Sequence, residues 1–162
     1  MNKAIFFDRD GVLNELVKRN NEFVSPQKII DFKINLNAKE LIKKARKKNY
    51  ICICISNQPD VSRNLMSKKE LDLMTENLLN TLDLDDIFYC LHDDSDNCEC
   101  RKPKIGLFKK AINKWDIDIS KSIFIGDTWR DYEAGNTLGI KTIIIKKKLD
   151  VCLFDDEIKD LQ

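Results

Sequence analysis

The chain has 162 residues, 43% of them hydrophobic, and its 28 basic and 27 acidic side chains give a net charge of +1. This length is enough for one domain with a sizeable core, which we expect over residues 1–162. The near-neutral charge gives no reason to expect a nucleic acid partner, and no apolar run approaches the roughly 20 residues that span a bilayer. The first apolar run starts too early to leave room for a signal peptide, so we expect a cytoplasmic monomer that binds neither nucleic acid nor membrane.

The first predicted element is a buried strand over Ala4–Phe7, and two acidic residues follow it in the sequence Asp8-Arg9-Asp10-Gly11. Alternate residues of an extended backbone point the same way, so Asp8 and Asp10 can face one reaction centre, while Gly11 permits a sharp turn. One carboxylate can attack a phosphoryl group while the other moves a proton. Two carboxylates this close also favour Mg²⁺. Taken alone, the pattern fits an ordinary strand-to-turn junction as well.

A helix and a second buried strand are predicted next. Four apolar residues at the spacing i, i+3, i+4 and i+7 mark the helix: Ala38, Leu41, Ile42 and Ala45. The strand covers residues 50–55, where Cys52 and Cys54 alternate with isoleucines, and it ends in the polar sequence Ser56-Asn57-Gln58. We expect Cys52, Cys54 and the later Cys152 to be reduced packing residues.

Further helices and strands alternate along the rest of the chain. Ser67 and Glu70 have the spacing of a capping box, which predicts the start of a helix with a face of Leu71, Met74 and Leu78. Apolar positions mark another helix: Leu107, Phe108, Ala111, Ile112 and Trp115. Strands are predicted over residues 122–125 and 141–145. Such alternation predicts an α/β fold with a doubly wound parallel sheet and an active site at the carboxyl ends of its strands.

Two short segments extend the chemistry suggested by the first motif: Arg101-Lys102-Pro103, and Gly126-Asp127-Thr128-Trp129-Arg130-Asp131 after a predicted strand. A phosphoryl group in transfer carries charge on its equatorial oxygens, so catalysis depends mostly on positioning and electrostatic stabilisation. The Ser56 hydroxyl and amides beside Asn57 can hold those oxygens, and Lys102 can offset repulsion between two anions. Each segment by itself also fits a solvated loop.

Two pairs of metal-ligand residues, each with one residue between, occur before Arg101: Cys90 with His92, and Cys98 with Cys100. Both members of such a pair lie on one side of an extended backbone. Three cysteines and a histidine form a ligand set of closed, tetrahedral structural Zn²⁺ sites. Separate buried thiols and a surface histidine are the alternative. A disulfide would need an oxidising compartment, which the sequence does not indicate.

The four motifs, in this order, resemble those of haloacid dehalogenase-like phosphatases: DxD, a Ser or Thr at a strand end, a Lys, and GDxxxD. The resemblance covers nearly the whole chain and implies a Rossmann-like core. It implies catalytic roles for four residues: Asp8, Asp10, Ser56 and Lys102. It also implies that Mg²⁺ is bound by Asp8, the main-chain carbonyl of Asp10, and Asp127. Asp131 would orient these ligands directly or through water.

The C-x-H and C-x-C-R-K-P pattern is similar to the zinc-containing capless branch of these phosphatases, which contains heptose 1,7-bisphosphate 7-phosphatases and histidinol-phosphate phosphatase domains. Residues 9–55 are too few for a separate cap domain, so core loops and the zinc loop would recognise the substrate. The resemblance implies substrate contacts by Asn57, Gln58, Arg101 and Arg63, and places residues 20–24 near the sugar.

The branch favours a small phosphorylated sugar, and a heptose bisphosphate first. The chain departs from the heptose enzymes at Pro59 and Asp60, at Thr128, where they often have a basic residue, and in its short loop between His92 and Cys98. Hydrolysis of histidinol phosphate remains an alternative, and a catalytically silent binding module is an alternative of another class. For Trp129 and Arg130, a role in shaping the pocket and a plain surface role are both open.

Overall fold

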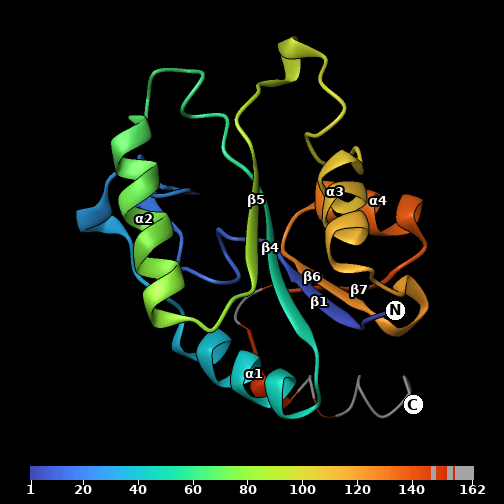
Figure 1. Ribbon diagram of the computed structural model, residues 1–162. Coiled ribbons are helices and arrows are strands. Elements are labelled where there is room, and N and C mark those ends of the chain that lie inside the picture. Colours follow the sequence, from blue (N-terminus) through green and yellow to red (C-terminus); the bar gives the residue numbers. More distant parts are fainter. Residues whose placement is uncertain (147–148, 153–154, 156–162) are drawn as a thin grey trace.

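The computed structural model describes residues 1–146, 149–152 and 155 (Figure 1). Its centre is a five-stranded sheet in the order β5-β4-β1-β6-β7, in which every neighbouring pair is parallel. The strands are β1 (Ala4–Phe7), β4 (Ile51–Asn57), β5 (Asp86–Cys90), β6 (Ile123–Gly126) and β7 (Lys141–Ile144). This arrangement confirms the predicted α/β fold. The strand order runs outward in both directions from β1, so a ligand crevice is expected at the carboxyl end of that strand.

Helices cover both faces of the sheet (Figure 1). Two pack with the sheet face that carries Ile5 and Phe7: α1 (Leu36–Lys47) and α2 (Lys68–Thr81). Two others pack with the face that carries Ala4 and Phe6: α3 (Gly106–Trp115) and α4 (Trp129–Leu138). Because alternate side chains of a strand point to opposite faces, β1 contributes to both halves of the core and is buried along its length.

The predicted helices α1 and α2 are confirmed. The four apolar residues of the α1 pattern are all buried, and the Asn35 side chain caps the helix by accepting the N–H of Asn37. Ser67 caps α2, because its hydroxyl accepts the Glu70 N–H at 3.2 Å. The second half of the expected capping box is different: the Glu70 carboxylate accepts the N–H of Ile29 at 2.6 Å. Glu70 therefore ties α2 to the preceding segment.

Several elements were not predicted. A two-stranded hairpin follows the first motif, with β2 (Val17–Arg19) paired to β3 (Glu22–Val24). Three-residue strands are too short to give a clear alternation pattern, and β5 is an edge strand that is buried only in part. Helix α4 was missed because it exposes Trp129 and Tyr132. Short 3₁₀ helices complete the order: η1 (Ile29–Asp31), η2 (Asp94–Asp96) and η3 (Ile119–Lys121).

The segment between β1 and β4 is fully described and contains the hairpin, η1 and α1, with no separate cap domain. Among the described helices, none is long and apolar enough to cross a membrane. All six cysteines are free, and Cys52 and Cys54 are buried as expected. The expectation for Cys152 is wrong, since its side chain is exposed. Residues 156–162 of the expected domain lie outside the described part of the chain.

Phe108 anchors the core between α3 and the sheet. Its ring meets those of Phe6 and Phe124 edge-on, with centroids 5.3 Å and 4.9 Å away. We expect Phe108→Ala to lower the free energy of unfolding by about 3–5 kcal/mol, because it leaves a cavity among rigid partners. Denaturant unfolding measures this, with Tyr132→Ala, an exposed residue of α4, as the control. Equal effects of the two substitutions would contradict this description of the core.

Candidate active site

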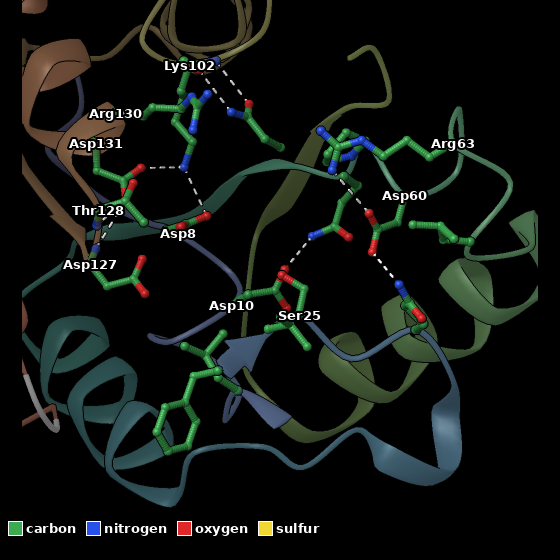
Figure 2. Close-up of a pocket in the computed structure, with 18 of the residues that line it drawn as sticks. Asp8, Asp10, Ser25, Asp60, Arg63, Lys102, Asp127, Thr128, Arg130 and Asp131 are labelled. Carbon is green, nitrogen blue, oxygen red and sulfur yellow. Dashed lines mark hydrogen bonds and ion pairs between the residues drawn. The ribbon is translucent and has the colours of Figure 1, made fainter. Parts of the chain in front are cut away.

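Most side chains singled out in the sequence gather at one edge of the sheet, where the parallel strands end (Figure 2). Asp8 and Asp10 follow β1, and Asp127 follows β6. Ser56 and Asn57 are the last two residues of β4. A pocket of about 470 Å³ opens at this edge, which is a volume suited to a small molecule.

Lys102 is a buried cation at the centre of the site. Its Nζ lies 2.9 Å from Asp8 Oδ1 and 2.6 Å from Asp131 Oδ1 (Figure 2), and it donates to the carbonyl oxygen of Ile55 at 3.0 Å. Burial opposes the charge of Lys102, but the charges of Asp8 and Asp131 raise its pKa above the ordinary value. Lys102 therefore supplies a fixed positive charge beside the candidate nucleophile.

Three carboxylates crowd together at the strand ends. Asp8, Asp127 and Asp131 each offer an oxygen within 4.8 Å of the others. Burial is the main reason that the pKa of Asp8 rises to about 6. Burial, followed by the charges of Asp8 and Asp131, raises the pKa of Asp127 to about 8. Asp127 Oδ1 is buried without a hydrogen-bond partner among the described residues. This donor set fits a hard divalent cation such as Mg²⁺.

Asp131 differs from the other two carboxylates because protein donors use both of its oxygens. Oδ1 accepts from Lys102. Oδ2 accepts the N–H groups of Asp127 at 3.1 Å and Thr128 at 3.0 Å, and the Thr128 hydroxyl at 3.0 Å. Asp131 thus caps the start of α4 and fixes the backbone of Asp127. This placement is consistent with the orienting role expected from the sequence.

Two glycines allow the acidic residues to approach so closely. Gly11 has a φ of +85°, and a Cβ at this position would lie 2.1 Å from Asp127 Oδ2. A Cβ at Gly126 would lie 2.4 Å from the Cβ of Asp131. A side chain at either position would push the carboxylates apart, so the chemistry of the site depends on both glycines.

Several donors hold the Asp10 carboxylate away from Lys102. Asp10 Oδ1 accepts from Arg9 Nε at 3.0 Å, Arg9 Nη2 at 2.9 Å and Asn14 Nδ2 at 3.0 Å. Gln58 Nε2 donates to Oδ2 at 2.7 Å. Asp8 and Asp10 therefore have separate cationic partners, Lys102 for the first and Arg9 for the second. The two carboxylates are adjacent in the chain but lie in different electrostatic environments.

Arg9 and Asn14 were not identified from the sequence. The Arg9 side chain is fully buried, and its guanidinium lies 5.5 Å from the Phe32 ring centroid and 5.9 Å from that of Tyr89. Burial opposes its charge, but Asp10 raises the pKa of Arg9 above the ordinary value. The sequence did contain a signal for Arg9, because it is a charged residue between two predicted catalytic aspartates. It was passed over because charged residues are usually exposed.

The polar residues that end β4 support other residues of the site. Ser56 has only 1% of its surface exposed, does not line the pocket, and accepts from Gln58 Nε2 at 3.0 Å. Asn57 forms a reciprocal pair with the Lys102 backbone, donating to its oxygen at 3.0 Å and accepting its N–H at 2.9 Å. Asn57 and Gln58 also line the pocket. Ser56 thus lies one layer deeper than the sequence analysis expected.

The cysteine and histidine side chains converge into one cluster after β5. The Sγ atoms of Cys90, Cys98 and Cys100 lie 3.1–3.6 Å apart, and His92 Nδ1 is 3.2 Å from Cys100 Sγ. Disulfides are excluded at these distances. The pKa of the Cys98 thiol is lowered to about 7. Burial opposes this change, but hydrogen bonds from N–H and S–H donors outweigh burial, and the Arg101 amide is the first of these donors. The cluster has the composition of a structural Zn²⁺ site.

The two arginines expected to contact substrate line the pocket, and both are held by acidic residues. Arg101 Nε donates to Asp94 Oδ1 at 2.7 Å. Arg63 binds both oxygens of Asp93, at 2.5 Å and 2.6 Å. Asp93 and Asp94 directly follow His92, and the sequence analysis assigned them no role. Because Arg101 also follows Cys100, the cysteine cluster positions both sides of this ion pair.

Comparisons with known proteins agree with this geometry. The family model described as polynucleotide kinase 3 phosphatase matches residues 3–149. A Haemophilus ducreyi protein named D-glycero-beta-D-manno-heptose-1,7-bisphosphate 7-phosphatase is 33% identical over 155 residues, which are 88% of this chain and 82% of that protein. A Photorhabdus laumondii protein named as the corresponding alpha-heptose phosphatase is 36% identical over 157 residues, with coverage of 90% and 82%.

A solved structure shows the same fold. It is the D,D-heptose 1.7-bisphosphate phosphatase from B. bronchiseptica complexed with magnesium and phosphate, with a TM-score of 0.76, 24% identity, and coverage of 90% of this chain and 82% of that one. A histidine biosynthesis bifunctional protein from Actinobacillus pleuropneumoniae is also similar, at 32% identity, but the match covers only 39% of that protein.

The crowded carboxylates lead to a prediction about stability. At a pH above 8, where the Asp127 carboxyl is ionised, we expect Asp127→Asn to raise the melting temperature of the Mg²⁺-free protein, by about 2–4 °C for each kcal/mol of relieved repulsion. The same substitution should remove the stabilisation that added Mg²⁺ gives the wild type. Thermal unfolding with and without Mg²⁺ measures both effects, with the exposed Asp72→Asn as the control. An unchanged response to Mg²⁺ would contradict the proposed ligand set.

Proposed function

Because the chain belongs to the haloacid dehalogenase-like phosphatases of the polynucleotide kinase 3 phosphatase family, we propose that it removes the 7-phosphate of D-glycero-D-manno-heptose 1,7-bisphosphate in an Mg²⁺-dependent reaction. One observation carries the proposal: the Nζ of buried Lys102 lies 2.9 Å from Asp8 at the end of β1. The heptose-phosphatase relatives, at 33–36% identity, supply the substrate. We further propose that the protein is a cytoplasmic monomer.

In the first step, an oxygen of Asp8 attacks the phosphorus of the 7-phosphate. The bond between phosphorus and the sugar oxygen breaks, and Asp10 gives its proton to that oxygen. The products of this step are the sugar without its 7-phosphate and an acyl phosphate on Asp8. Lys102 limits the repulsion between the Asp8 carboxylate and the dianionic phosphate.

In the second step, water attacks the phosphorus of the Asp8 acyl phosphate. Asp10, now a carboxylate, takes a proton from the water, the bond between phosphorus and Asp8 oxygen breaks, and inorganic phosphate leaves. The five hydrogen bonds donated by Arg9, Asn14 and Gln58 orient Asp10 as an acceptor, which this step requires. In this proposal Asp8 is thus the nucleophile, and Asp10 transfers the protons.

Mg²⁺ bound by Asp8 and Asp127, together with the Asp10 carbonyl, would neutralise negative charge on the phosphate oxygens. Asp131 would hold the backbone of Asp127 in place while pairing with Lys102. We propose Asn57 and Gln58 as substrate contacts through the parts of their side chains that line the pocket, and Arg101 and Arg63 as contacts to the remainder of the substrate.

We also propose a structural Zn²⁺ in the cluster of Cys90, His92, Cys98 and Cys100. A metal ion would replace the close contacts among three sulfur atoms and one imidazole nitrogen with four bonds to a single centre. Arg101 and Lys102 directly follow the last ligand. The ion would therefore fix the segment that carries the catalytic lysine.

Histidinol phosphate is the second candidate substrate, since a bifunctional histidine biosynthesis protein shares this fold segment. The same two steps would act on its phosphate ester. The test is phosphate release from a panel: both anomers of heptose 1,7-bisphosphate, histidinol phosphate, a 3′-phosphorylated oligonucleotide and common sugar phosphates. We expect one heptose anomer to be preferred. Preference for histidinol phosphate or for the oligonucleotide would overturn the substrate assignment.

The role of Asp8 is tested by Asp8→Asn, which keeps the shape of the side chain but removes the nucleophilic carboxylate. We expect kcat to fall by about a thousandfold or more, with the fold retained. The control is Asp83→Asn, at an exposed aspartate that is far from Asp8 in the sequence. Equal turnover by wild type and Asp8→Asn would refute the mechanism, while a well-folded wild type that hydrolyses nothing in the panel would favour the binding-module alternative.

The Zn²⁺ proposal is tested by metal analysis of protein purified without added metal. We expect about one equivalent of Zn²⁺, which a double substitution of Cys98→Ser and Cys100→Ser should remove. Cys152→Ser is the matched control because Cys152 is exposed and outside the cluster. The presence of free, readily alkylated thiols in a metal-free wild type would contradict the proposal.

A further inference from the structure

Arginine and aspartate side chains alternate along one side of the pocket mouth. Arg130 Nη2 donates to Asp94 Oδ2 at 3.1 Å, and Asp94 Oδ1 accepts from Arg101 Nε at 2.7 Å. Asp93 continues the series, with Arg101 at 4.0 Å and Arg63 at 2.5 Å. This row of charges joins three separate parts of the chain: the loop after β4, the loop after β5 with its following segment, and the start of α4.

The basic and the acidic side chains of this row are placed differently relative to the pocket. Arg63, Arg101 and Arg130 line the pocket, whereas Asp93 and Asp94 do not. The three guanidinium groups therefore face the ligand space, and the two carboxylates hold them from outside it. Asp60, which also lines the pocket, pairs with Arg63 at 3.4 Å, whereas at the other end of the row Arg101 and Arg130 share Asp94. A second anion, such as a phosphate remote from the reacting one, would complete this arrangement.

Arg130 has the most donors left for a ligand. Arg63 uses two nitrogens on Asp93 and a third near Asp60. Arg130 reaches a carboxylate with Nη2 alone, and its buried Nε has no hydrogen-bond partner among the described residues. Arginine has five N–H donors in a fixed fork. Arg130 therefore keeps donors available while Asp94 fixes its direction.

The backbone also places Arg130 firmly. It lies in the first turn of α4, between Asp127 and Asp131, whose side chains form part of the catalytic edge. Its guanidinium lies 4.8 Å from the ring centroid of Trp129, which limits its movement on the other side. Figure 2 shows Arg130 near Lys102 and Asp131 at the same end of the pocket. The first turn of α4 thus carries both Asp131, which fixes the Asp127 backbone, and a candidate anion contact.

We infer that Arg130 is a specificity-determining residue, which binds the anionic group of the substrate remote from the reacting phosphate and is oriented for this by Asp94. The inference rests on the proposed function, since it assigns a partner for the second phosphate of a bisphosphate. Arg130 does not contact the reacting atoms in this assignment. Its loss should therefore act on substrate selection more than on turnover.

The test compares two substrates that carry the same reacting group: D-glycero-D-manno-heptose 1,7-bisphosphate and D-glycero-D-manno-heptose 7-phosphate. Arg130→Gln should lower the kcat/KM for the bisphosphate by about tenfold, mainly through KM, because one charge-assisted contact is lost. The kcat/KM for the monophosphate should stay within about twofold. Arg130→Lys, which keeps the charge, should retain more of the preference than Arg130→Gln.

Arg46→Gln is the matched control, because Arg46 also pairs with aspartates but lies on α1, away from the pocket. It should leave the ratio of the two kcat/KM values unchanged. The inference is overturned if Arg130→Gln changes both substrates equally or neither, or if Arg130→Lys loses as much preference as Arg130→Gln. Melting temperatures of all variants separate these outcomes from unfolding.

The inference and the proposed function fail in different ways. If the wild type hydrolyses neither heptose substrate, the proposed function is wrong, whatever Arg130 does. If the wild type hydrolyses the bisphosphate and Arg130→Gln leaves its preference intact, the proposed function stands and the inference about Arg130 is wrong.

Discussion

The site depends on one buried ion pair, in which Lys102 lies between the carboxylates of Asp8 and Asp131. Buried charges are costly unless they are paired and hydrogen-bonded, so the surrounding chain has to meet strict requirements. Asn57 both donates to and accepts from the Lys102 backbone, and the Ile55 carbonyl accepts a hydrogen bond from the Lys102 ammonium group. The ends of β4 and β6 and the loop before α3 are thereby held in one geometry. The same contacts thus link the strand ends to one another and place the charged groups of the site.

A second buried pair keeps the two aspartates of the first motif distinct. Side chains two residues apart in an extended strand would otherwise share one environment and repel each other. Arg9, fully buried near two aromatic rings, pairs with Asp10, while Lys102 holds Asp8. Each carboxylate therefore has its own cation. This separation allows one to serve as nucleophile while the other handles protons.

The sequence predicted the parts of the site that depend on local chemistry. Residues that end buried strands and carry carboxylates, such as Asp8 and Asp127, could be placed because parallel strands end at one edge. The convergence of Cys90 and Cys98 could be predicted because ligand chemistry limits the possible partners. The roles of Asp94 and Arg130 could not be predicted, since the Arg130–Asp94 pair joins segments far apart in the chain, and the burial of Arg9 likewise depends on the distant rings of Phe32 and Tyr89. The deep position of Ser56 was missed for the same reason: only the packed structure shows that Gln58 lies between it and Asp10.

The two groups of charges differ in what a substitution can change. Lys102 is buried between Asp8 and Asp131, so removing its charge leaves uncompensated buried carboxylates at a cost of several kcal/mol. The Arg130–Asp94 pair is partly exposed, and exposed pairs contribute about 0–1 kcal/mol to stability. The pocket mouth can therefore exchange charges with little effect on folding, while the catalytic edge cannot. In the proposed function, substrate choice is accordingly carried by residues whose charges are held at the surface by the loop after β5, and the reaction by buried residues at the strand ends.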